Sequence, residues 1–275
     1  MASNPTALKK ANRFKTCFLE GKQSFGAWQM LPGSNVSRLL ARSGVDWVLV
    51  DCEHGNIDDA AMHEAVPAIA AAGCSPLVRL PDMQGWMVKR ALDSGAHGIL
   101  VPLIRTVEEA EQLILEAKFP PKGRRGFGSL IALERFEPNP TLTEYLHQAN
   151  DALVTIIQIE TKEAFDSVEQ IAAVDGVDAL FIGPFDLGNN IGLPVKNGVF
   201  SPELKSAMSR ILAATRKAGK KCGVYCKDSK QAREFAEQGY DMIVAVTDYT
   251  AIQHIVKEEL SLARGDAKPD GAGVF

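Results

Sequence analysis

The sequence predicts a single α/β domain folded as a (β/α)₈ TIM barrel. Eight short apolar segments, rich in β-branched residues, have the composition of buried parallel strands. Segments with an apolar residue at every third or fourth position, typical of amphipathic helices, lie between them. A length of 275 residues, 46% of them hydrophobic, suits one large barrel.

The predicted elements alternate along the chain. The strand candidates are residues 24–29, 47–51, 76–80, 98–103, 153–160, 179–182, 222–226 and 242–246. The helix candidates are residues 36–41, 60–71, 87–92, 107–117, 164–173, 204–218 and 231–236. Glycine stands at the turns where a left-handed helix C-cap is expected: Gly44, Gly73, Gly95, Gly219 and Gly239. A strand–helix unit repeated eight times closes as a barrel. A dinucleotide-binding open sheet is disfavoured, because the first turn has one glycine and lacks the Gly-rich fingerprint.

The chain divides into three expected parts. Residues 1–22 should form an N-terminal helical extension, 23–263 the barrel and 264–275 a disordered tail. The stretch 120–150 contains Pro-Pro, Arg-Arg and Gly-Phe-Gly and is too irregular for a plain helix. We therefore predict an active-site loop there.

Composition narrows the function classes. A net charge of −4 without a basic cluster argues against a nucleic-acid or anionic-membrane partner. No apolar run has membrane-spanning length. The five cysteines are odd in number and scattered, so we expect a reducing, cytoplasmic location without disulfides. The basic residues of the segment 9–15 leave an organellar signal as the alternative.

Polar side chains gather where the strand candidates end. They are Gln29, Asp51, Glu53, His54, Arg79, Gln158, Glu160 and Asp186. The carboxyl ends of the strands of a barrel meet at one mouth, where such folds build their active sites. Each residue alone has a structural explanation, such as a loop histidine or a salt-bridge arginine. Their joint placement favours a functional site.

The residue types of this set indicate chemistry on a 2-oxo acid. Glu160 and Asp186, expected at the ends of successive strands, are oxygen ligands that suit a hard divalent cation. Arg79 can anchor a carboxylate or a developing oxyanion, and His54 is a base candidate. A cation and an arginine together lower the cost of forming an enolate. No lysine stands at the end of a strand candidate among these positions, and Lys227, just after the candidate 222–226, is the nearest exception. A Schiff-base aldolase, which needs a lysine in the site, is therefore disfavoured.

Seven segments carry a resemblance to a known family. They are 51–54 (DCEH), 78–81 (VRLP), 92–96 (LDSGA), 101–102 (VP), 125–129 (RGFGS), 158–161 (QIET) and 182–187 (IGPFDL). In this order and spacing, the chain resembles the HpcH/HpaI aldolase family from about residue 25 to about residue 263. The resemblance implies a barrel of the phosphoenolpyruvate/pyruvate-binding type.

The resemblance assigns roles on the pyruvate side. Glu160 and Asp186 match the ligands of one divalent cation per subunit, which is Mg²⁺, Mn²⁺ or Co²⁺. Arg79 matches the residue that stabilises the pyruvate enolate. Gln158 matches a pyruvate contact, as do the backbone amides near Phe185 and Asp186.

The resemblance also implies a shared site. His54 matches the acid/base residue, Asp51 a nearby structural acid, and Asp93 an acid supplied to the histidine across a subunit interface. The family pattern implies a C-terminal helix exchanged between subunits and a homo-oligomer, most simply a hexamer built of two trimers. Similarity to macrophomate synthase, a fungal relative, implies a fungal source.

The implied activity is metal-dependent aldol cleavage of a 4-hydroxy-2-oxo acid to pyruvate and an aldehyde, through a metal-bound pyruvate enolate. Oxaloacetate decarboxylation or macrophomate-synthase-like carbon–carbon bond formation is the alternative, and the complete residue set disfavours a non-catalytic barrel. Phe185 and Cys52 stand where smaller residues are common in the bacterial heptanedioate enzymes. The stretch 130–136 also differs from the arginine-bearing loop of those enzymes. The identity of the aldehyde therefore stays open.

Overall fold

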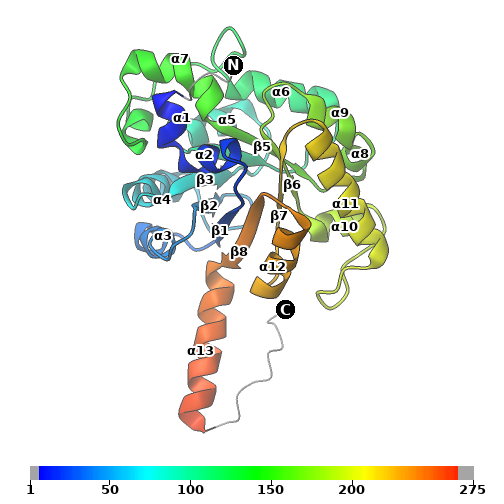
Figure 1. Ribbon diagram of the computed structural model, residues 1–275. Helices are drawn as coiled ribbons and strands as arrows, with labels where there is room; N and C mark the ends of the chain where they lie inside the picture. The colour runs from blue at the N-terminus through cyan, green and yellow to red at the C-terminus, as the bar shows by residue number, and fades with distance from the viewer. Residues whose placement is uncertain (1–5, 266–275) are drawn as a thin grey trace.

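A computed structural model of the chain describes residues 6–265 and confirms the predicted fold class (Figure 1). Eight parallel strands pair in chain order, and β1 also pairs with β8 to close the barrel. The strands are β1 (Ser24–Gln29), β2 (Trp47–Asp51), β3 (Ser75–Arg79), β4 (Gly98–Val101), β5 (Val154–Ile159), β6 (Ala179–Ile182), β7 (Lys221–Val224) and β8 (Met242–Thr247). All eight strand candidates are present, with ends shifted by a few residues at most.

Helices surround the barrel. They are α1 (Ala7–Ala11), α2 (Arg13–Leu19), α3 (Ser34–Ala41), α4 (Asp59–Ala71), α5 (Gly85–Asp93), α6 (Val107–Ala117), the 3₁₀ helix η1 (Ile131–Arg135), α7 (Leu142–Ala152), α8 (Lys162–Asp166), α9 (Val168–Ala173), α10 (Pro184–Asn190), α11 (Pro202–Lys217), α12 (Ser229–Gln238) and α13 (Asp248–Arg264). The five glycines predicted as C-caps all have positive φ, the backbone conformation that lets a helix turn sharply into the next strand.

The stretch 120–150 is in part irregular, as predicted, since residues 123–129 form no helix or strand, but it does not line the candidate cavity of its own chain. It contains η1 and most of α7, and α7 begins with a capping box in which Thr141 and Glu144 satisfy each other's backbone N–H groups. α7 contacts α1, and η1 lines a cavity at the end of the barrel where the strands begin. The stretch thus packs away from the mouth predicted to hold the site.

Large side chains fill the barrel interior. Trp47 is fully buried, and a Cβ on Gly26 of the adjacent strand would lie 2.1 Å from its ring, so a glycine there gives the indole its space. Phe14 and Phe18 of α2 pack against this cluster, with 6.0 Å between the ring centroids of Phe14 and Trp47. The described part of the N-terminal extension therefore closes the end of the barrel opposite the mouth.

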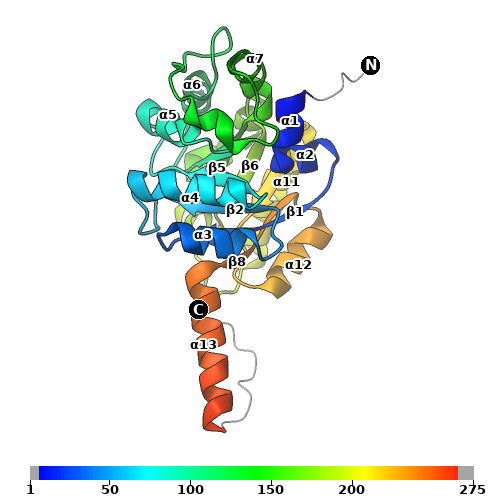
Figure 2. The ribbon, with the colours of Figure 1, turned by 90° about the vertical axis from the view of Figure 1, so that its left-hand side faces the viewer.

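α13 is set apart from the other helices. In both views it extends from the end of β8 away from the body of the barrel (Figures 1 and 2). No helix among residues 6–265 is long and apolar enough to cross a membrane. The tail expected over 264–275 lies outside the described residues from residue 266 onward.

Candidate functional site

A cavity of about 280 Å³ opens at the ends of the strands where the sequence placed the site. The described residues that line it are Trp28, Met30, Asp51, His54, Arg79, Gln158, Phe181, Gly183, Pro184, Phe185, Asp186, Tyr225 and Tyr249. Of the eight residues given roles by the family resemblance, six are among them: Asp51, His54, Arg79, Gln158, Phe185 and Asp186. Glu160 lies directly behind Gln158, and Asp93 is elsewhere.

Asp51 and Arg79 form a buried ion pair at the tips of adjacent strands. They are paired in register as the last residues of β2 and β3, which brings their side chains together. Arg79 Nε and Nη2 donate to Asp51 Oδ1 and Oδ2 at 2.9 and 2.6 Å. Trp28 Nε1 donates to Asp51 Oδ2 at 2.9 Å. Burial alone would raise the pKa of Asp51, but Arg79 and then Trp28 hold it below its ordinary value.

Glu53 extends this cluster toward His54. Its Oε2 lies 2.9 Å from Arg79 Nη1, as an ion pair without hydrogen-bond alignment, and its Oε1 lies 3.8 Å from His54 Nε2. Burial raises the pKa of Glu53 to about 7; the charge of Arg79 opposes this rise, and those of Asp51 and Asp186 add to it. The His54 side chain is 59% exposed, so it faces the open side of the cavity. Glu53 thus connects the base candidate to the arginine.

Glu160 is a buried carboxylate held from two sides. It follows β5, accepts from Leu103 N at 2.9 Å and accepts a hydrogen bond from Gln158 Nε2. A Cβ on Gly183 would lie 2.7 Å from Gln158 Nε2 and 2.8 Å from Glu160 Oε2, so only glycine leaves room for this pair. Burial, opposed by the two hydrogen bonds and aided by the charges of Glu53 and Asp186, raises the pKa of Glu160 to about 7.

The sequence suggested that Asp186 stands at the end of a strand, but the structure places it in a helix. β6 ends at Ile182, and Pro184 opens α10, which places Asp186 in the first helical turn. Proline suits this position because it needs no backbone N–H partner. Asp186 still lines the cavity, and its charge acts on Glu160.

This donor set fits a magnesium-like cation. Among residues 6–265 no group of three or more His, Cys, Asp or Glu side chains is arranged to hold a metal. The candidate ligands are therefore limited to two carboxylates, Glu160 and Asp186, of which the second acts electrostatically on the first. Gln158 Oε1 is buried without a hydrogen-bond partner among the described residues. Magnesium typically takes one or two carboxylates and completes its shell with water and substrate oxygens.

Asp93 is placed outside the cavity of its own chain. At the end of α5 it accepts a hydrogen bond from the buried Arg125 Nη2 at 2.8 Å, and Ser129 Oγ donates to its backbone carbonyl at 2.7 Å. The single chain therefore does not bring Asp93 to His54.

Aromatic side chains form much of the remaining cavity lining, and of these only Phe185 was predicted from the sequence. Trp28 lies 5.7 Å from Phe181 and 5.6 Å from Tyr225, centroid to centroid. The alternation of side chains along β1 could have placed Trp28 inside the barrel. Tyr225 and Tyr249 follow β7 and β8, and nothing in their local sequence indicates the direction of their rings.

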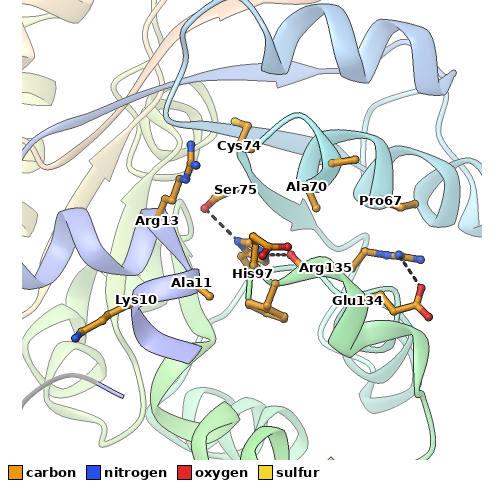
Figure 3. Close-up of a pocket in the computed structure, with 14 residues that line it drawn as sticks. Lys10, Ala11, Arg13, Pro67, Ala70, Cys74, Ser75, His97, Glu134 and Arg135 are labelled. Atoms are coloured by element: carbon orange, nitrogen blue, oxygen red, sulfur yellow. Dashed lines mark hydrogen bonds and ion pairs between the residues drawn. The ribbon is translucent and has the colours of Figure 1, made fainter. Parts of the chain in front are cut away.

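A second cavity, of about 310 Å³, lies at the opposite end of the barrel (Figure 3). Its buried floor holds His97, whose Nε2 donates to Arg135 O at 2.8 Å, so that Nδ1 accepts from Ser75 Oγ at 3.1 Å. Burial lowers the pKa of His97 to about 4. In Figure 3 the Arg135 guanidinium turns to Glu134 and Lys10 points outward. Both ring nitrogens of His97 are thus engaged in structural hydrogen bonds. This cavity is therefore not the candidate site.

The barrel and its acid-and-arginine mouth define a class of protein: the family model described as HpcH/HpaI aldolase/citrate lyase matches residues 25–254. The chain belongs to this family and is a carbon–carbon lyase.

Three relatives place it more closely. A hydroxypyruvate/pyruvate aldolase of Agrobacterium fabrum is 30% identical over 258 residues, which are 94% of this chain and 96% of the relative. A 4-hydroxy-2-oxo-heptane-1,7-dioate aldolase of Salmonella paratyphi B is 34% identical over 265 residues, 96% and 99% of the two chains. The crystal structure of macrophomate synthase has a TM-score of 0.82 at 27% identity, covering 96% of this chain and 91% of that one. The two curated relatives are bacterial, so the expected fungal source gains no support.

Proposed function

We propose that the chain is a divalent-metal-dependent aldolase that reversibly cleaves a 4-hydroxy-2-oxo acid to pyruvate and an aldehyde through a pyruvate enolate. One observation carries this proposal. Arg79, Gln158 and Asp186 line the same cavity, and Glu160 is hydrogen-bonded to Gln158 directly behind it. This arrangement supports the proposal, because it sets an arginine and two candidate cation ligands around a space of about 280 Å³.

Each residue has a distinct role in this proposal. Arg79, held rigid by Asp51 and Glu53, retains N–H groups that can donate to the enolate oxygen. Gln158 and the backbone amides near Phe185 and Asp186 orient pyruvate. A cation held by Glu160 and Asp186 would supply Lewis-acid stabilisation of negative charge.

His54 moves the proton in this proposal. It is the histidine that lines the cavity, and its imidazole can take the proton of the C4 hydroxyl during cleavage. Cleavage then breaks the C3–C4 bond, releases the aldehyde and leaves the electron pair on the enolate, which takes a proton at C3 to give pyruvate.

We propose further that the protein is a homo-oligomer, most simply a hexamer of two trimers, with α13 exchanged between subunits. Ile252, Ile255 and Val256 of α13 are each 49% exposed, although they are apolar. A second copy of the chain would cover this face. It would also allow Asp93, held by Arg125, to reach the His54 of another copy. The five free cysteines favour a cytoplasmic location.

Oxaloacetate decarboxylation is the second candidate, since it passes through the same enolate. The structural similarity to macrophomate synthase supports oxaloacetate decarboxylation as this second candidate. The residues of the pyruvate half serve both reactions, so rates with oxaloacetate and with 4-hydroxy-2-oxo acids must be compared on the same preparation.

Proton exchange at C3 of pyruvate tests the shared step. In D₂O, the methyl proton signal of pyruvate should fade with the protein and Mn²⁺ or Mg²⁺, and persist with Glu160→Ala or with chelator. Arg90→Ala is a matched control, because Arg90 pairs with Asp59 through Nε and Nη2 but is 51% exposed and outside the cavity. An absence of exchange with every divalent metal would contradict the proposed function.

A further inference from the structure

One wall of the cavity is aromatic, and its Trp28 touches the Asp51–Arg79 cluster, with the Arg79 guanidinium carbon 4.8 Å from the centroid of the Trp28 ring. Phe185 lies 6.4 Å from Tyr225 and 6.2 Å from Phe200, nearly edge-on to Phe200 at 89°. The Tyr225 hydroxyl lies 3.1 Å from Thr247 Oγ1, so the polar end of this ring already has a partner. Trp28 Nε1 is likewise engaged with Asp51. The wall therefore presents ring surface, and two of its polar groups are already engaged.

The charges of the lining residues also favour an uncharged ligand next to this wall. Of the described residues that line the cavity, Arg79 is the one that is always cationic. Its guanidinium is paired with Asp51 and Glu53 and is assigned to the pyruvate oxygen. Asp51 and Asp186 line the same cavity. Among the described residues of one chain, a second carboxylate on the substrate would thus meet acids, ring faces and the imidazole of His54, but no permanent cation besides the paired Arg79, and losing its hydration there is costly.

We propose that the acceptor half of this site takes an uncharged aldehyde with an aliphatic or aromatic body, in preference to an aldehyde that carries a carboxylate. This inference rests on the proposed function and adds the substrate class to it. In the bond-forming direction, C3 of pyruvate loses one proton and attacks the aldehyde carbon. The C=O π pair moves to oxygen, which takes one proton, so the product is a 4-hydroxy-2-oxo acid with one carboxylate.

The named activity of one relative sharpens the contrast. Heptane-1,7-dioate has a carboxylate at each end, so that enzyme must accommodate a second one. The present chain has Phe185, a large apolar ring, in the wall of its cavity. Such a ring both fills space and offers no polar group, which favours a hydrocarbon body over a charged one.

Two aldehydes of equal shape test the inference. 4-Methylpentanal and 4-oxobutanoate differ only in an isopropyl group in place of a carboxylate. With the full-length protein, Mn²⁺ and saturating pyruvate, kcat/KM should be at least about tenfold higher for 4-methylpentanal, since burying an unpaired charge costs more than a methylene mismatch. Equal values, or a preference for 4-oxobutanoate, would overturn the inference. Pyruvate C3 exchange on the same sample separates the two proposals, because exchange without the preference leaves the proposed function standing.

Two variants locate the preference in the wall. Phe185→Arg and Tyr249→Arg each place a cation among the rings, and either should shift the ratio of kcat/KM values at least about tenfold toward 4-oxobutanoate. Trp86→Arg is the control: Trp86 is 64% exposed and lies outside this cavity, so the ratio should not change. A wild-type ratio in both folded wall variants would show that the acceptor does not contact this wall. The use of two positions covers the case in which one variant fails to fold.

Discussion

Replacing Arg79 with alanine removes the guanidinium shared by Asp51 and Glu53, and we expect two separable losses. The first is in stability. The Arg79 side chain is only 8% exposed, and its removal leaves the Asp51 charge buried. Breaking a buried pair typically costs about 3–5 kcal/mol. Asp51 keeps the Trp28 indole and the backbone N–H groups of Glu53 and His54 as donors, so the lower end of that range applies.

A loss of about 3 kcal/mol leaves the protein folded, since domains are typically stable by roughly 5–15 kcal/mol. The melting temperature should fall by roughly 6–12 °C, which a circular-dichroism melt measures. The second loss is in catalysis. Removing one donor to a developing oxyanion costs about 3 kcal/mol in a water-excluded site, a rate factor of about 10² or more. Pyruvate exchange and oxaloacetate decarboxylation should both decline by that factor.

Arg90→Ala separates these effects from the general loss of an arginine–aspartate pair. The Arg90–Asp59 pair has similar geometry but is exposed, so its removal should change stability by less than about 1 kcal/mol and leave the rates unchanged. Near-wild-type rates in a folded Arg79→Ala protein would show that the enolate is stabilised elsewhere. A wild-type melting temperature would show that the buried pair is not a net stabilising element.

Three further outcomes are expected. His54→Ala should slow aldol cleavage more than oxaloacetate decarboxylation, which needs no base for a hydroxyl, whereas Glu160→Ala should slow both; equal losses on His54→Ala would contradict the proton-transfer role. Mn²⁺ affinity, measured by calorimetry, should rise with pH between about 6 and 8. Glu160, with a raised pKa of about 7, is protonated below that pH and must lose the proton to bind a cation, so a flat profile would exclude it as a ligand. Ile255→Glu places a charge on the apolar face of α13 and should lower the mass measured by light scattering; an unchanged oligomer would show that this face is not an interface.

The period of the apolar residues was enough to predict the barrel. Buried parallel strands are short continuous apolar runs, and in the intervening helices an apolar residue recurs every three to four positions. Both patterns can be recognised from a short stretch of sequence. The strand containing Phe181 was predicted with its observed bounds, 179–182, but Asp186 was wrongly placed at the end of this strand, because the apolar run continues after β6 ends. Pro184 was the signal that a helix begins there. α7 was missed although Thr141 and Glu144 have capping-box spacing, because the polar face of this helix obscured its apolar stripe.

The candidate site was predicted for its polar half and missed for its apolar half. Acids and arginines after apolar strands stand out in a sequence, and barrel closure brings them together whatever the loops do. Rings do not stand out in this way, since Trp28, Phe181 and Tyr225 could equally belong to the core. The bridging position of Glu53 depends on the turn after β2, and the partner of Asp93 depends on how copies assemble. Neither follows from spacing along the chain.

Leu103 has consequences for how this site tolerates mutation. Its φ of 57° is in the left-handed region, which a leucine rarely occupies, and its backbone N–H donates to Glu160 Oε1 at 2.9 Å. The group that orients the carboxylate is therefore main chain, and a side-chain scan through this position would not remove it. Glycine at 103 would keep the bond and relax the backbone, whereas proline would delete the N–H altogether. Substitutions at position 103 should therefore leave catalysis unchanged unless they alter the backbone itself. The orientation of Glu160 should tolerate most side chains at this position.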